Sequence, residues 1–414
     1  MGFLDMFLKG QRKDYFKYRL ILDIGTEFLK AVMVEYNNRE KNILGFGRAK
    51  QNYGSMDGGA ITNINSVIEK AKIAVEQACS STPHYPQDMA AGIAGEFVKG
   101  VLISIDTQRK NPNKEINCKE IDDLVISGRE QAYAKAVKMA EMETGIKDVK
   151  LELIQDAIVE VKVDGYRVNN PYQFKGNNIN VIIFYTFAPL VQIGAIETIA
   201  GKLGYKLALT VAEPYAVASS ILTNEAYEFG AIIIDIGGGT TDIALIRNGG
   251  IEGTRMFAMG GRAFTRSIAA NLNIGLKKAE KLKLKYSQGQ QIKDCDIINK
   301  LIKRDLNILY QGIELSLKDL AQGEMLPSNI YFCGGGSGLK GLVEGFKNLS
   351  LKKELPFKKH PNIAILKGND MTEIADKNNY LTDVDHTTPK ALSFYGACRG
   401  NNQKGLMDFE SQRL

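Results

Sequence analysis

Two aspartates, Asp23 and Asp235, each end an apolar run of the kind that forms a buried strand, and each is followed by glycine and threonine. A strand that ends in this way can turn sharply and direct its backbone N–H groups toward an anion such as a phosphate. An aspartate at the end of such a strand is placed to hold a divalent cation through water. The two segments therefore predict two phosphate loops, each with a carboxylate directed at a metal ion.

The first loop is short, and its candidate residues are Asp23, Gly25, Thr26 and Lys30. The second loop carries more polar groups, and its candidate residues are Asp235, Gly237, Gly238, Gly239, Thr240, Thr241 and Asp242. Either segment alone is also compatible with an ordinary hairpin that has an Asp-Gly turn, and Lys30 with a solvated lysine. Two copies about half a chain apart favour instead a duplicated domain with a cleft between its halves.

The two loops resemble the phosphate loops of the superfamily of actin, heat-shock chaperones and sugar kinases. Residues 212–216 resemble the connecting segment of that superfamily, whose glutamate, here Glu213, orients the attacking water. Residues 279–283 resemble its adenine-contacting helix, with Glu280 and Lys283 on one face. Residues 333–339 resemble its adenosine loop, and the residues concerned are Gly334, Gly335, Gly336 and Ser337. The resemblance implies Mg²⁺ and ATP as cofactors, Asp23 and Asp235 as the metal-directed residues, and a weak ATPase activity at most.

The same residues also have simpler interpretations. Glu213 precedes a proline, and Glu-Pro often opens a helix, so this side chain is also compatible with a helix cap. Glu280 and Lys283 are also compatible with an exposed ion pair on the surface of a helix.

Within the superfamily, the chain most resembles the bacterial cell-division family FtsA. Three segments carry this resemblance, namely residues 58–63, residues 259–269 with Gly260 and Gly261, and residues 279–286. It extends from about Leu20 to Ala397 and implies an actin-like protein that forms filaments and tethers the division tubulin FtsZ to the membrane. The implied location is the cytoplasmic face of the cell membrane at the division site. Arg304 falls where the family has an arginine that binds the C-terminal peptide of FtsZ, although a lone surface arginine is more often only solvated.

The expected fold is α/β, a duplicated actin-like (ribonuclease H-like) ATPase fold. The FtsA resemblance implies an inserted 1C-type (SHS2) subdomain, through which other divisome proteins would bind, and a helical 2B-like subdomain. The predicted parts are a membrane-targeting segment (1–18), a first core subdomain 1A (19–86 and 188–212), the 1C insert (87–187), a second core subdomain 2A (213–261 and 326–398), the 2B insert (262–325) and a polar, disordered tail (399–414).

Apolar periodicity predicts several individual elements. Residues 19–50 read as three strands, and Asn63 as the cap of the helix that follows. Longer helices are expected at 119–142 and 295–320, the second with an apolar face that includes Ile297 and Leu315. Residues 350–388 read as polar connections, and a final short helix is expected at 389–397.

Composition narrows the class of protein. The chain has 414 residues, 44% hydrophobic and 24% charged, and a net charge of +6 that is too small and too dispersed to indicate nucleic-acid binding. Its five cysteines form no C-x-x-C pair, which favours reduced thiols. No apolar run approaches the roughly 18 residues that a membrane-spanning helix needs.

The N-terminal residues predict contact with a membrane surface. On a helix, Phe3, Leu4, Phe7 and Leu8 share one apolar face, while lysine and arginine residues nearby supply charge for anionic lipid headgroups. The alternative is that this face packs on the protein itself. The remaining alternatives concern the whole chain: a pilus assembly adaptor resembling PilM, with the same fold and a peptide from an inner-membrane protein as partner, or a small-molecule kinase of the same superfamily.

Overall fold

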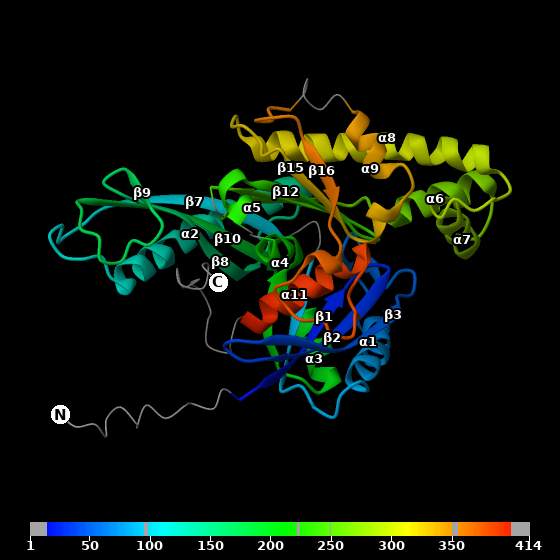
Figure 1. The fold of residues 1–414 in the computed structure, drawn as a ribbon, viewed down its shortest axis with the longest axis horizontal. Coiled ribbons are helices and arrows are strands. Elements are labelled where there is room, and N and C mark those ends of the chain that lie inside the picture. The colour runs from blue at the N-terminus through cyan, green and yellow to red at the C-terminus, as the bar shows by residue number, and fades with distance from the viewer. Residues whose placement is uncertain (1–14, 95–97, 222–223, 249, 350–354, 399–414) are drawn as a thin grey trace.

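The fold consists of two similar halves and an inserted sheet (Figure 1). The computed structural model describes residues 15–94, 98–221, 224–248, 250–349 and 355–398. In the view of Figure 1 the first half lies below, the second half above it, and the insert to the left of the second half. None of the helices in these described ranges is both long and apolar enough to cross a bilayer.

The first half is built on a sheet with the strand order β11-β6-β1-β2-β3. Its strands are β1 (Lys17–Ile24), β2 (Phe28–Tyr36), β3 (Lys41–Lys50), β6 (Asp88–Ile93) and β11 (Leu207–Ala212). The first three form an antiparallel meander, and β6 pairs in parallel with both β1 and β11. The three strands predicted within residues 19–50 are thereby confirmed.

The second half repeats this topology. Its sheet has the order β14-β13-β12-β15-β16, with strands β12 (Ala231–Ile236), β13 (Thr241–Arg247), β14 (Gly250–Phe257), β15 (Asn329–Cys333) and β16 (Asn362–Ile365). Again three antiparallel strands come first, and two strands parallel to the first of them complete the sheet. The duplicated α/β fold expected from the sequence is confirmed.

Two strand assignments differ from the sequence-based expectation. The segment predicted as an insert at 87–187 begins with β6, which pairs with β1 and so belongs to the first sheet. The segment predicted as polar connections at 350–388 contains β16, which pairs in parallel with β15. Both strands are short, and the choice of a pairing partner depends on long-range contacts that local composition does not encode.

The insert has a sheet of its own, with the order β7-β10-β8-β9. Its elements are β7 (Lys99–Gln108), α2 (Cys118–Thr144), β8 (Leu151–Val163), β9 (Tyr166–Val168) and β10 (Asn178–Pro189). A separate apolar core lies between α2 and this sheet, and β14 of the second half contacts β7, β8 and β10. The insert is therefore seated against the second half.

Helices cover both large sheets. Those associated with the first are α1 (Ile64–Cys79), α3 (Leu190–Leu203), α4 (Glu213–Ser220) and α11 (Thr387–Cys398), and those associated with the second are α5 (Asn224–Phe229), α6 (Gly261–Leu272), α7 (Leu276–Ser287), α8 (Cys295–Ala321) and α9 (Leu342–Asn348). Asn63 caps α1 as predicted, since its side chain accepts a hydrogen bond from the Ser66 amide. Helix α4 contacts α11 in the first half and β13 in the second, so it connects the two. Short elements complete the fold: β4 (Met56–Asp57), β5 (Ala60–Ile61), and the 3₁₀ turns η1 (Gly335–Gly338), η2 (Gly368–Asp370) and η3 (Val384–His386).

Helix α8 has a narrower apolar face than the sequence suggests. Residues such as Ile298, Ile302 and Leu309 are buried against the second sheet and its helices. Ile297 and Leu315, which were expected on the same face, are 48% and 67% exposed. The apolar residues of α8 extend around more than one face of the helix, and only one of these faces is buried. Ile297 and Leu315 lie outside the buried face.

A buried arginine ties the start of the fold to its end. Arg19 on β1 is 1% exposed and forms a two-pronged ion pair with Asp88 on β6, at 2.5 and 2.8 Å. It also donates a hydrogen bond of 2.6 Å to the backbone carbonyl of Gly396 in α11. The last helix therefore completes the polar environment of a side chain in the first strand.

Candidate functional site

The two halves bring their equivalent hairpins together around one cavity. Asp23 lies near the end of β1 and is paired in register with Lys30 on β2, whose ammonium is 2.9 Å from the carboxylate. Asp235 holds the equivalent place on β12, and its register partner on β13 is Asp242. The hairpin of the first half thus presents a carboxylate and a lysine to the cavity, and the hairpin of the second half presents two carboxylates.

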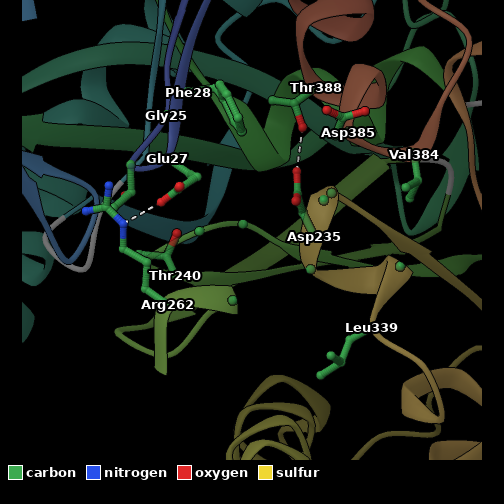
Figure 2. Close-up of a pocket in the computed structure, with 18 of the residues that line it drawn as sticks. Gly25, Glu27, Phe28, Asp235, Thr240, Arg262, Leu339, Val384, Asp385 and Thr388 are labelled. Atoms are coloured by element: carbon green, nitrogen blue, oxygen red, sulfur yellow. Dashed lines mark hydrogen bonds and ion pairs between the residues drawn. The ribbon is translucent and has the colours of Figure 1, made fainter. Parts of the chain in front are cut away.

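The cavity between them has a volume of about 680 Å³. Figure 2 shows Asp235 near its centre, Gly25 and Thr240 toward one side, and Leu339 toward another. Most of the candidate residues line it, namely Asp23, Gly25, Thr26, Lys30, Glu213, Asp235, Gly237, Gly238, Thr240, Asp242, Gly261, Glu280, Lys283, Gly334, Gly335 and Gly336. Segments separated by more than three hundred residues in the chain therefore meet at one site.

Carboxylates dominate the electrostatics of the cavity. Burial raises the pKa of Glu213 well above its ordinary value, and the charges of Asp23, Asp242 and Asp235 raise it further. Burial and the charge of Asp235 likewise raise the pKa of Asp242. Burial also raises the pKa of Asp235, although a hydrogen bond of 2.5 Å from Thr388 and the charge of Lys30 oppose the shift.

This group of acids fits a divalent cation. Oxygen ligands are what Mg²⁺ prefers, and a cation among carboxylates that repel one another would restore their charged forms. Asp242 supports this fit, because its Oδ1 atom is buried and has no hydrogen-bond partner, while Oδ2 accepts a 3.0 Å bond from Thr240. Asp23 and Asp235, the residues predicted to direct the metal, lie in the same group.

Gly238 lines the cavity and also lies against the first loop. A Cβ atom at Gly238 would lie 2.9 Å from Cβ of Glu27 in the first loop. Gly239 has a similar neighbour, since its Cβ would lie 2.7 Å from Oγ1 of Thr26. The two loops are in direct contact, and the absence of side chains at 238 and 239 permits that contact.

Another part of the cavity wall is formed by α7 and the turn η1. Lys283 is 9% exposed, and its Nζ donates to the Gly261 carbonyl at 2.8 Å and to Thr265 at 3.0 Å. It also forms a 3.0 Å ion pair with Glu280. The simpler interpretation of these two residues as an exposed surface pair is wrong, because both line the cavity within a buried network.

Four of the predicted residues lie behind the cavity wall. Thr241 is fully buried and donates a 2.7 Å bond to the Met259 carbonyl, while Ser337 donates to the Cys333 carbonyl. A Cβ at Gly260 would lie 2.6 Å from the Gly237 carbonyl oxygen, and Gly239 faces Thr26. These residues are placed to hold the loops in shape and do not line the cavity themselves.

The candidates for partner and membrane contact lie elsewhere. The Arg304 side chain on α8 is 56% exposed, and it bonds to Asp305 and to the Ser267 hydroxyl, outside the cavity. Phe3, Leu4, Phe7 and Leu8 lie outside the described residues.

Sequence reasoning missed several residues of the cavity, namely Glu27, Arg48, Arg262, Lys367, Asp383, Asp385 and Thr388. A signal existed for Arg262, because it directly follows the predicted Gly261. None existed for Thr388, whose importance depends on a hydrogen bond to Asp235, 153 residues away in the chain.

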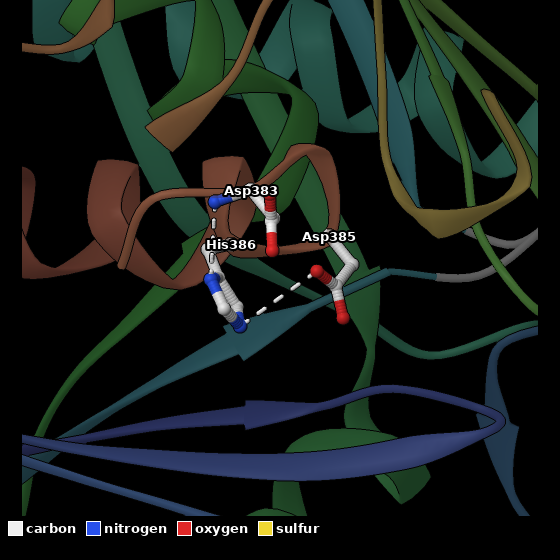
Figure 3. Close-up of side chains that lie close together, drawn as sticks. All are labelled: Asp383, Asp385 and His386. Atoms are coloured by element: carbon white, nitrogen blue, oxygen red, sulfur yellow. Dashed lines mark hydrogen bonds and ion pairs between the residues drawn. The ribbon is translucent and has the colours of Figure 1, made fainter. Parts of the chain in front are cut away.

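The segment before Thr388 is held by a small acid–histidine cluster (Figure 3). Nδ1 of His386 accepts hydrogen bonds from the backbone amides of Thr382 and Asp383, at 3.2 and 3.3 Å. Asp385 lies 3.7 Å from Nε2 of His386 and forms an ion pair of 3.4 Å with Arg48 on β3. Burial lowers the pKa of His386, and the positive charges of Lys30 and Arg48 add to this shift against the opposing charge of Asp385. A neutral imidazole can therefore act as the acceptor that shapes this turn.

Comparison with known structures defines the class of protein. The fold matches a chain of the "PilM-PilN type IV pilus biogenesis complex" with a TM-score of 0.65 and 18% sequence identity, covering 92% of this chain and 98% of that one. The protein thus has an actin-like fold, with a cavity between its two similar halves.

Comparison of sequences finds similarity to one family of bacterial proteins. The family model "Cell division protein FtsA" matches residues 232–384. FtsA of Neisseria meningitidis is 26% identical over 283 residues, which cover 68% of this chain and 63% of that protein. FtsA of Enterococcus faecalis is 26% identical over 344 residues, covering 78% of this chain and 74% of that protein. The chain is therefore similar to FtsA in sequence, and it spans less than two thirds of the Neisseria relative.

Proposed function

We propose that the cavity binds ATP with Mg²⁺ between the two halves and that the protein is a weak ATPase at most. The observation that carries this proposal is the meeting of two glycine-rich turns, from equivalent hairpins, at a group of buried carboxylates. Lys30 and the amides of the two loops would face the phosphates, and Asp23 and Asp235 would hold the hydrated metal. The base and ribose would lie toward Glu280, Lys283 and the glycines of η1.

Glu213 is proposed to orient the attacking water. Glu213 begins α4, which connects the two halves, and it lines the cavity. Its carboxylate lies against Gly92 of β6, because a Cβ atom at Gly92 would lie 2.7 Å from Oε1 of Glu213. Burial and the surrounding acids raise its pKa, and a bound cation would favour its charged form, in which the carboxylate can accept a hydrogen bond from water.

We further propose that the protein acts in cell division as a filament-forming, membrane-associated adaptor of the FtsA kind. Support comes from the sequence similarity to FtsA proteins. In this proposal Arg304 on α8 binds the C-terminal peptide of the division tubulin FtsZ, and the four-stranded insert binds other division proteins. The N-terminal segment binds anionic lipid at the cytoplasmic face of the cell membrane, at the division site.

A second candidate function is that of a pilus assembly adaptor. It is favoured by one observation, namely that the fold matches nearly the whole length of the protein in the PilM–PilN complex. In this case the partner would be a peptide of a PilN-like protein.

Peptide binding separates these two functions. Fluorescently labelled peptides from the C-terminus of FtsZ and from PilN are titrated with the full chain in the presence of ATP and Mg²⁺. The division function is supported if the FtsZ peptide binds the wild type and the control Lys303→Glu, at the preceding position of the same helix, but does not bind Arg304→Glu. Binding of the PilN peptide alone would refute it and support the pilus function.

A further inference from the structure

One ion pair joins the first phosphate loop to helix α6 of the second half, beside the cavity. Nε of Arg262, at the start of α6 in the second half, donates a 2.7 Å hydrogen bond to Oε2 of Glu27, in the β1–β2 turn of the first half. The residues are 235 positions apart in the chain. Figure 2 shows this contact beside Gly25 and Thr240, at the end of the cavity where the loops meet.

Arg262 holds the second loop as well as the first. Its backbone amide donates a 2.8 Å hydrogen bond to the carbonyl of Gly238, the residue whose missing side chain lets Glu27 approach. One residue thus binds the second loop through its main chain and the first loop through its side chain. Any separation of the loops must break or stretch one of these contacts.

The surroundings of the pair make its loss costly. The Arg262 side chain is only 6% exposed and that of Glu27 is 18% exposed. The guanidinium of Arg262 also lies over the ring of Tyr53 from the first half, 4.9 Å from its centroid. Burial raises the pKa of Glu27, but the ion pairs with Lys50 and Arg262 outweigh this effect and hold the pKa below its ordinary value, so the carboxylate is charged. Removal of Glu27 would leave the largely buried guanidinium of Arg262 without this counterion, and removal of Arg262 would leave Glu27 paired with Lys50 alone.

Lys50 provides a natural comparison within the same group. It forms a 2.8 Å ion pair with the other oxygen of Glu27, but it lies on β3 of the first half and its side chain is 49% exposed. The Lys50–Glu27 pair therefore stays within one half, whereas the Arg262–Glu27 pair connects both. Loss of Lys50 removes an ion pair whose lysine is half exposed and leaves the contact between the two halves in place.

We propose that the Glu27–Arg262 ion pair is a latch that holds the two halves together at the phosphate end of the cavity and limits the rate of nucleotide release. The inference rests on the proposed nucleotide site, since it concerns release from that site. Opening of the latch separates the loops, and the bound phosphates then lose their contacts with both at once.

The test measures dissociation of a fluorescent ATP analogue, chased with unlabelled ATP, from the full chain. Glu27→Gln and Arg262→Gln should each raise the dissociation rate about tenfold, which corresponds to about 1.4 kcal/mol. The double variant should be no faster than the faster single variant, because either change already breaks the pair. The control Lys50→Gln should stay within about twofold of the wild type. Equal rates for Glu27→Gln and Lys50→Gln would overturn the proposal.

A second measurement does not depend on nucleotide. Hydrogen exchange of the amides in residues 24–28 and 236–241 is followed in protein without nucleotide. The latch predicts faster exchange of both loops in Glu27→Gln and unchanged exchange in Lys50→Gln, and unchanged exchange in both variants would refute it. If the wild type fails to bind the analogue, the proposed nucleotide site is wrong, and this measurement still decides whether the pair holds the halves together.

Discussion

Asp235 faces Asp242 across the β12–β13 hairpin at the register position where, in the first half, Asp23 faces Lys30. The duplicated hairpins thus agree in backbone and differ in charge. The first offers a carboxylate already neutralised by a lysine, at 2.9 Å, and the second offers two carboxylates whose pKa values are both raised by burial. The unbalanced negative charge lies on the second half, so a cation is expected to bind closer to Asp235 and Asp242.

The pH dependence of stability follows from this excess of acid. A carboxyl group whose pKa is higher in the folded protein binds protons more tightly when folded, so stability is lost as the pH rises from the unfolded pKa through the folded one. For Glu213 and Asp242 this loss begins near their ordinary values of 4.5 and 3.8. We expect Glu213→Gln, without divalent metal, to raise the melting temperature at pH 7 by roughly 2 °C or more.

The expected gain is smaller at pH 4.5, where the wild-type carboxyl is protonated without cost. Thermal unfolding in EDTA at the two pH values measures the difference. A gain that is equal at both pH values would show that repulsion among the acids does not destabilise the fold.

Replacement of Glu213 by alanine tests the proposed chemistry. Glu213→Ala should retain ATP binding and slow phosphate release by roughly 10²-fold, the scale of lost acid–base assistance. Single-turnover phosphate release, measured beside analogue binding, separates the two effects. Turnover equal to that of the wild type would leave Glu213 as a residue that begins α4.

The hydrogen bond from Thr388 to Asp235 should contribute to metal affinity. Thr388→Val removes the hydroxyl with little change of shape, and the loss of a buried bond to a charged group costs about 1.5–3 kcal/mol, or roughly tenfold or more in the Mg²⁺ dissociation constant. Calorimetric Mg²⁺ titration in the presence of nucleotide measures it. Thr198→Val, which removes an exposed helical hydroxyl bonded to Gly194, is the control and should bind as the wild type does.

Contact between the loops should make position 238 intolerant of side chains. Gly238→Val would push on Glu27, whose Cβ lies 2.9 Å from the position of the new Cβ, and we expect the separated loops to lose the fluorescent ATP analogue. Gly201→Ala, at a helical glycine with open space around it, should bind normally. Unchanged affinity in a folded Gly238→Val protein would contradict the proposed phosphate site.

The membrane prediction rests on sequence alone. Deletion of residues 1–12 should release the protein from anionic liposomes in a flotation assay, because the few apolar side chains of this segment provide the expected binding energy, only a few kcal/mol. Among single changes Phe7→Glu should weaken binding most, because Phe7 is expected near the centre of the apolar face. Deletion of residues 401–414 should leave binding intact. The reverse result for the two deletions would place the lipid-binding segment at the C-terminus.

Features that repeat along the chain or depend on near neighbours were predictable. The strand-turn-strand pattern at Asp23 and Asp235 gave the duplicated hairpins, and Asn63 gave a helix start, because turns and caps are local. The contacts of Arg262 with Glu27 and of Thr388 with Asp235 were not predictable, since each joins residues more than one hundred and fifty positions apart. Long-range contacts also explain why β6 was placed in the wrong sheet and β16 was missed. These strands have only six and four residues, so the strand with which each one pairs determines the sheet to which it belongs.

The environment of Arg19 has a consequence for synthesis of the chain. Its guanidinium is enclosed by Asp88 and by the carbonyl of Gly396, so a nascent chain that lacks α11 cannot complete the buried contacts of its own first strand. The first half is therefore expected to stay open on the ribosome until α11 has emerged. The second half, whose strands and helices lie between residues 224 and 365, can assemble earlier, although it is translated later than most of the first.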